Sequence, residues 1–173
     1  MRVLFDGEIH VHYRFLGLEQ AEDFDPPESH GATVRRQRNG LLGRQGGALS
    51  MVTGLHTGQV PIRVEWHDAA PEPDLVSEEV VEVSFVCAGG PYVVRAFDSA
   101  VDVGDLPSGP LRARWLANGM DAGQEADTRM DGEPAPDRYV LKLWPAPPAP
   151  GALLRQTSKA AAYWHRLAAR ADR

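Results

Sequence analysis

The feature that most constrains the fold is a strict alternation of apolar and polar residues in several short stretches. In residues 8–15 (EIHVHYRF), aliphatic or aromatic side chains alternate with Glu, His, His and Arg. Successive side chains of a β-strand point to opposite faces of its sheet, so this period predicts a half-buried strand. Residues 60–67 (VPIRVEWH) alternate in the same way and predict a second strand.

Further strands are predicted where apolar runs end at Gly or Pro. The runs are 49–53, 78–87, 92–97, 111–119 and 139–144. The turn sequence AGGP at 88–91 predicts that two of them form a hairpin. Because 14 prolines and 17 glycines interrupt the chain, a helical bundle is excluded.

The alternation also assigns side chains to faces. In the run 78–87 we expect Val81, Val83 and Phe85 inside and Glu82 and Ser84 outside. In the run 111–119 we expect Leu111, Ala113 and Trp115 inside, and Arg112 and Arg114 in solvent. Outward positions of a sandwich strand are polar by default, so neither set of polar residues indicates a site.

Residues 157–171 carry the one convincing helical pattern. Thr157 or Ser158 is expected to cap the helix, and its predicted apolar stripe is Ala160, Tyr163, Trp164, Leu167 and Ala171. The fold class is therefore mainly β: an antiparallel β-sandwich with one C-terminal α-helix. We expect residues 1–144 to form the sandwich domain, with a long 19–48 excursion, and residues 145–173 to be a Pro-rich connector plus a helix packed on the same domain.

The net charge of −6 limits the classes of partner. Binding to nucleic acid irrespective of its sequence depends on Lys and Arg that neutralise phosphates, so an acidic chain favours a basic protein partner instead. The single cysteine, Cys87, ends an apolar run and is expected to be a small buried residue. No run approaches the ~20 apolar residues of a membrane span, and no secretion signal is recognisable, so we expect a cytoplasmic protein with no membrane partner.

His10 and His12 are the only candidate metal ligands that share a short motif. Residues i and i+2 of a strand project from one face, so both imidazoles can reach one ion. A complete site needs further ligands, for which His56, His67, His165 and Glu8 are candidates that the sequence does not place nearby. A solvated polar face is the simpler explanation of the two histidines, because outward positions of a sandwich strand are polar by default, and we predict no metal and no cofactor.

The carboxylates between residues 121 and 137 are the candidate partner-binding residues. The segment contains Asp121, Glu125, Asp127, Asp131, Glu133 and Asp137, and the first five form the predicted partner-binding set. The spacing of a calcium-binding loop is absent, and two prolines intrude. A solvated loop is the alternative reading, and a pair of acids for proton transfer stays open because the sequence does not fix their separation.

Arginines and tryptophans suggest two other kinds of site. Arg35, Arg36 and Arg38 lie in the 19–48 excursion and are a candidate anion-binding set, although a solubilising loop is the simpler explanation. The four tryptophans offer stacking surfaces for a carbohydrate or another small ligand, and three of them fall where core residues are equally expected. No catalytic residue is predicted, since the sequence has no nucleophile elbow and no phosphate-binding glycine motif.

Four segments together resemble the competence protein J family and actinobacterial proteins that share its plan. They are I-x-V-x-Y-x-F at 9–15, G-x-x-x-G-Q-V-P-I-x-V at 54–64, EEVVEVSF at 78–85 and DLPSGPLR at 105–112. The family pattern LP-x-G-x-Y-x-L is matched at Leu106, Pro107 and Gly109, but Leu111 stands where the family has an aromatic residue. The resemblance covers roughly residues 8–118 and contains no catalytic signature.

This resemblance implies a small β-sandwich that inhibits a DNA-entry nuclease by binding it. We therefore expect a non-catalytic protein-binding module, an inhibitor or regulator of a basic nuclease or of a toxin. A small-ligand or carbohydrate-binding sandwich is the alternative, and a metal-dependent enzyme using His10 and His12 is the third reading. The oligomeric state is not predicted by any of these features.

Overall fold

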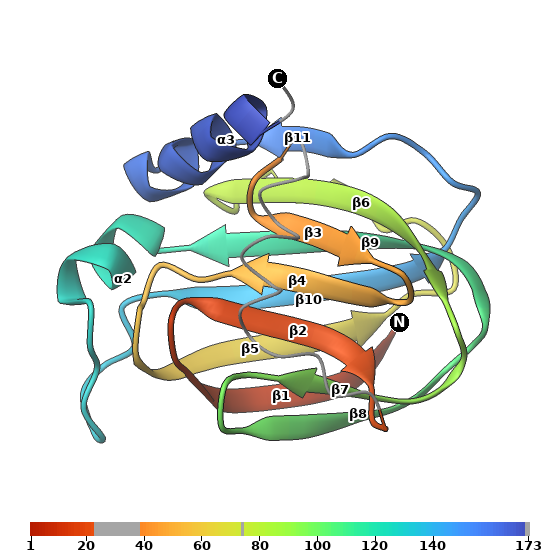
Figure 1. The fold of residues 1–173 in the computed structure, drawn as a ribbon, viewed down its shortest axis with the longest axis horizontal. Helices are drawn as coiled ribbons and strands as arrows, with labels where there is room; N and C mark the ends of the chain where they lie inside the picture. The colour runs from red at the N-terminus through yellow and green to blue at the C-terminus, as the bar shows by residue number, and fades with distance from the viewer. Residues whose placement is uncertain (23–38, 74, 172–173) are drawn as a thin grey trace.

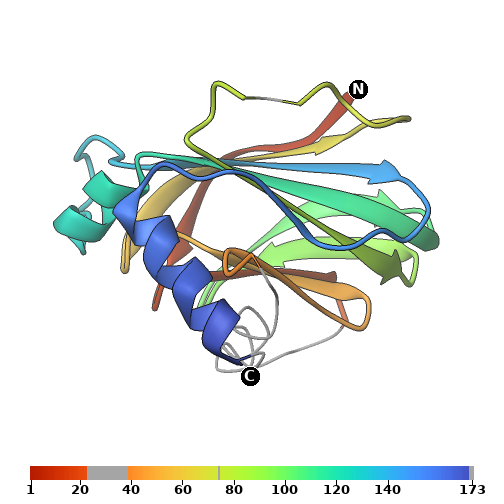
Figure 2. The same cartoon turned by 90° about the horizontal axis from the view of Figure 1, so that it is seen from above.

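The computed structural model describes residues 1–22, 39–73 and 75–171, which form two facing β-sheets and two helices (Figures 1 and 2). Sheet A has the strand order β1 (Arg2–Val11), β5 (Gly58–Trp66), β10 (Arg138–Pro145), β9 (Gly109–Asn118), β6 (Glu79–Cys87), β11 (Ala152–Arg155). Sheet B has the order β3 (Leu42–Gln45), β4 (Ala48–Val52), β2 (Phe15–Gln20), β7 (Gly90–Arg95), β8 (Ala100–Leu106). All neighbouring strands are antiparallel except β5 and β10, which are parallel.

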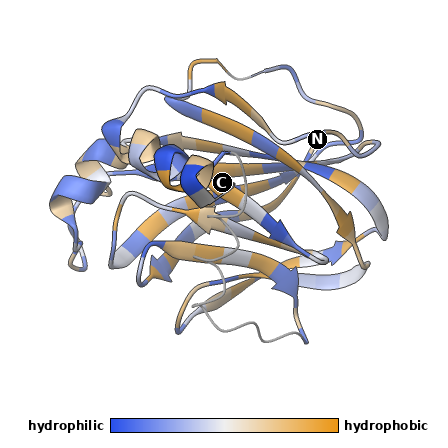
Figure 3. Ribbon diagram, turned by 45° about the horizontal axis from the view of Figure 1, so that its top comes forward, coloured by the Kyte–Doolittle hydropathy of each residue, from blue (hydrophilic) through white to orange (hydrophobic). Residues whose placement is uncertain are grey.

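The two sheets enclose one hydrophobic core, which confirms the predicted β-sandwich. Side chains of both inner faces are fully buried there, including Leu18, Val60 and Trp115. Apolar and polar residues alternate along many of the strands (Figure 3). Cys87 is 1% exposed at the end of β6, as expected for a small buried residue.

The chain reverses direction inside the stretch that the alternation predicted as one strand. β1 begins at Arg2, continues through Asp6 and Gly7, and ends at Val11. The next strand starts at Phe15, because two consecutive residues between them have positive φ angles of 62° and 71°. Two such residues are what a two-residue turn of type I′ requires. The predicted strand over 8–15 was therefore right for residues 8–11, which lie in β1, and wrong in continuing beyond Val11.

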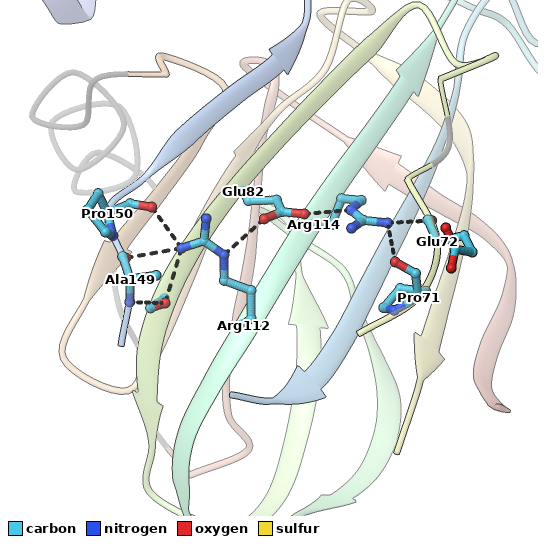
Figure 4. A network of polar contacts seen from close by, with 8 residues as sticks. Pro71, Glu72, Glu82, Arg112, Arg114, Ala149 and Pro150 are labelled. Carbon is cyan, nitrogen blue, oxygen red and sulfur yellow. Dashed lines mark hydrogen bonds and ion pairs between the residues drawn. The ribbon is translucent and has the colours of Figure 1, made fainter. Parts of the chain in front are cut away.

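The outward faces of β6 and β9 are buried, contrary to the prediction that they face solvent. Glu82 is 9% exposed and Ser84, Arg112 and Arg114 are equally enclosed. Figure 4 shows the reason: the segments around Pro71 and Ala149 lie over this face of sheet A and accept hydrogen bonds from the two arginines. An alternating pattern reports which residues share a face, but it does not report whether that face is covered.

Several short elements were not predicted. The helix α2 (Met120–Ala126) lies in the segment expected to be a loop, and it buries only Met120 and Gly123, so it has no apolar stripe to detect. β8 lies between the predicted strands 92–97 and 111–119, and β11 follows the Pro-rich connector. β3 lies within the 19–48 segment that was expected to be an excursion.

The C-terminal helix α3 (Lys159–Ala171) contacts both sheets (Figure 2). Ser158 caps it, as predicted, because its hydroxyl accepts the Ala161 N–H at 3.1 Å. The Ser158 N–H donates to Glu79 of β6, and the Trp164 ring lies edge-on to Phe15 of β2 at 5.7 Å between centroids. The predicted apolar stripe is partly wrong, since Tyr163 is 49% exposed.

A close approach between Gly40 and α3 fixes the position of the helix. Gly40 has a φ of +71°, and a β-carbon there would overlap the Trp164 carbonyl oxygen and lie 2.7 Å from the His165 nitrogen. The neighbouring imidazole of His165 is half-buried, and neither of its ring nitrogens has a hydrogen-bond partner among the described residues. Burial lowers the pKa of His165 to about 4.

We expect Gly40→Ala to lower the free energy of unfolding by about 3 kcal/mol, the sum of left-handed backbone strain and overpacking. Gly46→Ala is the matched control, because Gly46 has a φ of +55° but nothing within 4 Å of a new β-carbon. It should cost about 1 kcal/mol. Denaturant unfolding measures both, and equal losses would show that the contact with α3 contributes nothing.

We expect the stability of the protein to fall as the pH drops from about 6.5 towards 4, partly because of His165. In this window the unfolded chain binds a proton at His165 and the folded chain does not, so protonation favours unfolding. His165→Leu should reduce the loss of stability between pH 7 and pH 5, measured by thermal unfolding. His10→Leu changes a surface imidazole and serves as the control; a parallel decline in wild type and His165→Leu would contradict the assignment.

Candidate partner-binding surface

The five predicted partner-binding carboxylates do not form one cluster. All five are exposed, but their contacts differ. Asp121 caps α3 by accepting the N–H groups of Lys159 and Ala160, at 3.2 and 2.8 Å. Glu133 accepts the Met130 N–H at 2.8 Å within its own loop.

Of the remaining three, Asp127 has a contact that ties it to another part of the molecule. Its carboxylate pairs with Arg14 of the β1–β2 turn at 3.1 Å. Glu125 and Asp131 face solvent on α2 and in the loop that follows it. The structure therefore brings Asp127, and not the whole predicted set, to the end of the sandwich where β1 meets β2.

The sixth acid of the segment, Asp137, is buried and holds the acidic loop against sheet B. One carboxylate oxygen accepts the Leu55 N–H at 2.8 Å and the Tyr139 hydroxyl at 2.5 Å. The Tyr139 oxygen in turn accepts the Gly54 N–H at 2.6 Å. Burial raises the pKa of Asp137, and it raises the pKa of Tyr139 further with the help of the adjacent carboxylate. This pair joins the loop after β4 to β10.

The two candidate metal ligands point to different partners. The His10 Nδ1 lies 3.5 Å from the Asp98 carboxylate, whereas the His12 Nδ1 lies 3.5 Å from the Thr57 hydroxyl. His56 is close to His12, with 5.9 Å between ring centroids. Within residues 1–22, 39–73 and 75–171, no group of three or more His, Cys, Asp or Glu side chains is arranged to hold a metal ion.

The structure gives little support to the other predicted sites, the arginine set and the tryptophans. Arg35, Arg36 and Arg38 lie outside the described residues. Trp115 is stacked on Tyr139 in the core, and Trp144 is buried beneath the Arg114 guanidinium. Trp66 borders a shallow apolar hollow lined mainly by prolines. None of the described helices has the length and apolar character needed to cross a bilayer.

Ion pairs along β1 and at its end share one orientation: the cation is the more buried partner. The Arg14 side chain is 19% exposed, whereas its partner Asp127 is 61% exposed. The Arg129 side chain is 11% exposed and its partner Glu8 is 43% exposed, at 2.8 Å.

In two further contacts the carboxylate is again the more exposed partner. They are Asp98 beside the His10 imidazole and Asp6 beside Arg63, whose second partner, Glu65, is the more buried of that pair. This surface therefore presents carboxylates to solvent while their counter-charges lie behind them. We call the four outward acids the carboxylate rim: Asp6, Glu8, Asp98 and Asp127.

Aromatic rings gather between members of the carboxylate rim, and the sequence did not predict them as a group. His12 and Tyr13 come from the β1–β2 turn, His56 from the β4–β5 loop and Phe97 from the β7–β8 loop, with 4.2 to 5.9 Å between ring centroids. Figure 1 shows these three connections at the same end of the sandwich. The missing signal was the turn, since an unbroken strand would have placed Tyr13 inside.

No protein-family model and no curated protein matches the chain. Two solved structures resemble it. One is ComJ, described as an inhibitor of the DNA degrading activity of NucA, from Bacillus subtilis, with a TM-score of 0.57 and 14% identity over 84% of this chain and 98% of that chain. The other is crocagin biosynthetic gene J, with a TM-score of 0.47 and 15% identity over 84% and 99%. At this identity the likeness concerns architecture, and the chain has a ComJ-like fold.

Proposed function

We propose that this chain is a non-catalytic protein-binding module that inhibits or regulates a basic nuclease. The observation that carries the proposal is the orientation of the arginine pairs of the rim, which direct carboxylates to solvent and keep Arg14, Arg63 and Arg129 behind them. A nuclease must attract phosphates to its cleft, so its cleft carries positive potential. A surface that displays carboxylates can occupy such a cleft and exclude DNA from it.

Two other observations support the proposal. The net charge of −6 favours rapid association with a basic protein. The ComJ-like fold is a second support, because ComJ, a protein of this architecture, is described as an inhibitor of a DNA-degrading activity. At 14% identity the partner of ComJ does not transfer to this chain, so the nuclease here is defined by its basic cleft alone.

The proposal is tested by retaining partners on the immobilised full chain from a native lysate of the source organism, at low and at moderate salt. We expect a basic protein to be retained more strongly at low salt, because exposed charges are screened as the ionic strength rises. The retained protein, once isolated, should degrade plasmid DNA, and an equimolar amount of this chain should stop it. Retention of nothing at either salt, or a retained nuclease that stays fully active, contradicts the proposal.

A double substitution in the carboxylate rim should slow association with the retained protein. Asp98→Asn with Asp127→Asn removes two outward charges, and we expect the association rate at low salt to fall about tenfold, with a weaker dependence on salt. The control is Asp102→Asn with Asp105→Asn, which removes two exposed charges from β8. Surface plasmon resonance at several salt concentrations separates the two, and equal effects would mean that only net charge matters.

A further inference from the structure

The turn between β1 and β2 holds an exposed aromatic side chain in a strained backbone conformation. Tyr13 has a φ of 62° and its side chain is 51% exposed. Bulky residues rarely adopt positive φ, and Asn or Gly would form this turn more easily. Because the ring is not in the core, burial does not compensate for the strain, and strain of this kind concentrates at functional sites.

The turn is held in place by contacts that do not involve the Tyr13 side chain. The Arg14 guanidinium donates to the Gly54 carbonyl and pairs with Asp127. The Arg14 carbonyl accepts the Thr53 N–H at 2.9 Å, and its N–H donates to the His56 carbonyl at 3.3 Å. The backbone that carries Tyr13 is thus fixed by two segments, the β4–β5 loop and the residue after α2, without help from the Tyr13 ring.

Phe97 doubles the exposed aromatic area. It lies in the connection between β7 and β8, is 51% exposed, and has its ring centroid 5.6 Å from that of Tyr13. The His12 ring contacts both of these rings, and the His56 ring contacts that of Tyr13. Two adjacent aromatic rings on rigid turns lose little conformational entropy on binding, which is the property of an interface anchor.

The charges beside the rings define the partner. Asp98 follows Phe97 directly, and Asp127 pairs with the residue after Tyr13, so each ring has an outward carboxylate near it in the chain or through one contact. A complementary surface is an apolar hollow edged by Lys or Arg. Arginine suits it best, because a guanidinium can stack on an aromatic ring while pairing with a carboxylate.

We infer that Tyr13 and Phe97 form the apolar anchor of this protein's interface, and that they insert into an arginine-edged hollow of a basic protein partner. The inference rests on the proposed function and deepens it, since it locates the centre of the contact between Asp98 and Asp127. In interfaces of this kind a few central aromatic residues supply most of the affinity, and the surrounding charges set the rate of encounter.

Photo-crosslinking identifies what lies against the anchor. Benzoylphenylalanine replaces Tyr13, Phe97 or, as the matched control, Tyr163, whose ring on α3 is 49% exposed. Each full-length variant is irradiated in a native lysate, and the adducts are identified by mass spectrometry. We expect positions 13 and 97 to give an adduct with the same basic protein, lost at high salt, and position 163 to give none. An adduct with a second copy of this chain or with nucleic acid overturns the inference.

Substitution separates anchoring from a structural role. Tyr13→Asn retains a residue that tolerates positive φ, so we expect an unchanged or higher midpoint of thermal unfolding. The same variant, and Phe97→Ala, should weaken binding of the retained protein at least about 30-fold. Tyr163→Ala should change it less than about threefold.

The outcomes distinguish this inference from the proposed function. If Tyr13→Asn and Phe97→Ala bind the retained nuclease as tightly as wild type while the rim double variant binds it more slowly, the anchor is wrong and the proposed function stands. If Tyr13→Asn lowers the unfolding midpoint and affinity together, the ring has a structural role and the anchor is also wrong. If no protein is retained by wild type, both fail.

Discussion

Two arginines share one glutamate on the outer face of sheet A, and the covering of that face depends on this contact. Glu82 of β6 accepts a hydrogen bond from the Nε of Arg112 at 3.0 Å and from that of Arg114 at 2.7 Å, both on β9 (Figure 4). All three side chains are largely enclosed. One carboxylate cannot satisfy two buried guanidinium groups, and unsatisfied buried charges are expensive. The Ser84 hydroxyl accepts a further bond from Arg112 at 3.1 Å, and backbone carbonyls supply the other acceptors, from Pro71 and Glu72 on one side and from Ala149 and Pro150 on the other.

This arrangement decides where recognition can occur. Because the two covering segments close the middle of the outer face of sheet A, its polar residues are not available to a partner. The accessible functional groups lie along the edge strand β1 and at the end of the sandwich, where the turns of both sheets meet. The outward carboxylates and the exposed rings occupy that region together, and two of the carboxylates pair with arginines of its loops, Arg14 and Arg129. By holding the covering segments in place, Arg112 and Arg114 therefore leave the edge and the end of the sandwich as the accessible polar surface.

The sequence predicted the architecture because apolar residues that face the core recur at every second position along the strands. Val81, Val83, Phe85 and Trp115 are buried as the pattern required, and Ser158 begins the terminal helix. The pattern failed where long-range contacts override it. Tyr13 and Arg14 adopt the left-handed region and end β1 early. Neither is Gly or Asn, the residues that usually mark such a turn, so the local sequence carried no signal of it.

Site residues were predictable only in part, for a related reason. The surface charge of the segment 121–133 was evident from composition, and Asp127 does reach the β1–β2 turn. The orientation of an ion pair depends on which partner lies deeper, and that follows from packing between distant segments. The grouping of Tyr13 with Phe97 joins residues more than eighty positions apart, so no motif could reveal it.

The position of β10 in the middle of sheet A has a consequence for biosynthesis. β10 lies between β5, with which it is parallel, and β9, with which it is antiparallel. Until the ribosome has released residues 138–145, β1 and β5 form one fragment of the sheet and β6 and β9 another, and no backbone hydrogen bonds join the two. Parallel pairing over such a separation is slow because a long loop must close first. The β5 edge therefore stays unpaired from residue 66 until β10 is made, and the β9 edge stays unpaired from residue 118 until then. These are the edges on which aggregation or a chaperone would act.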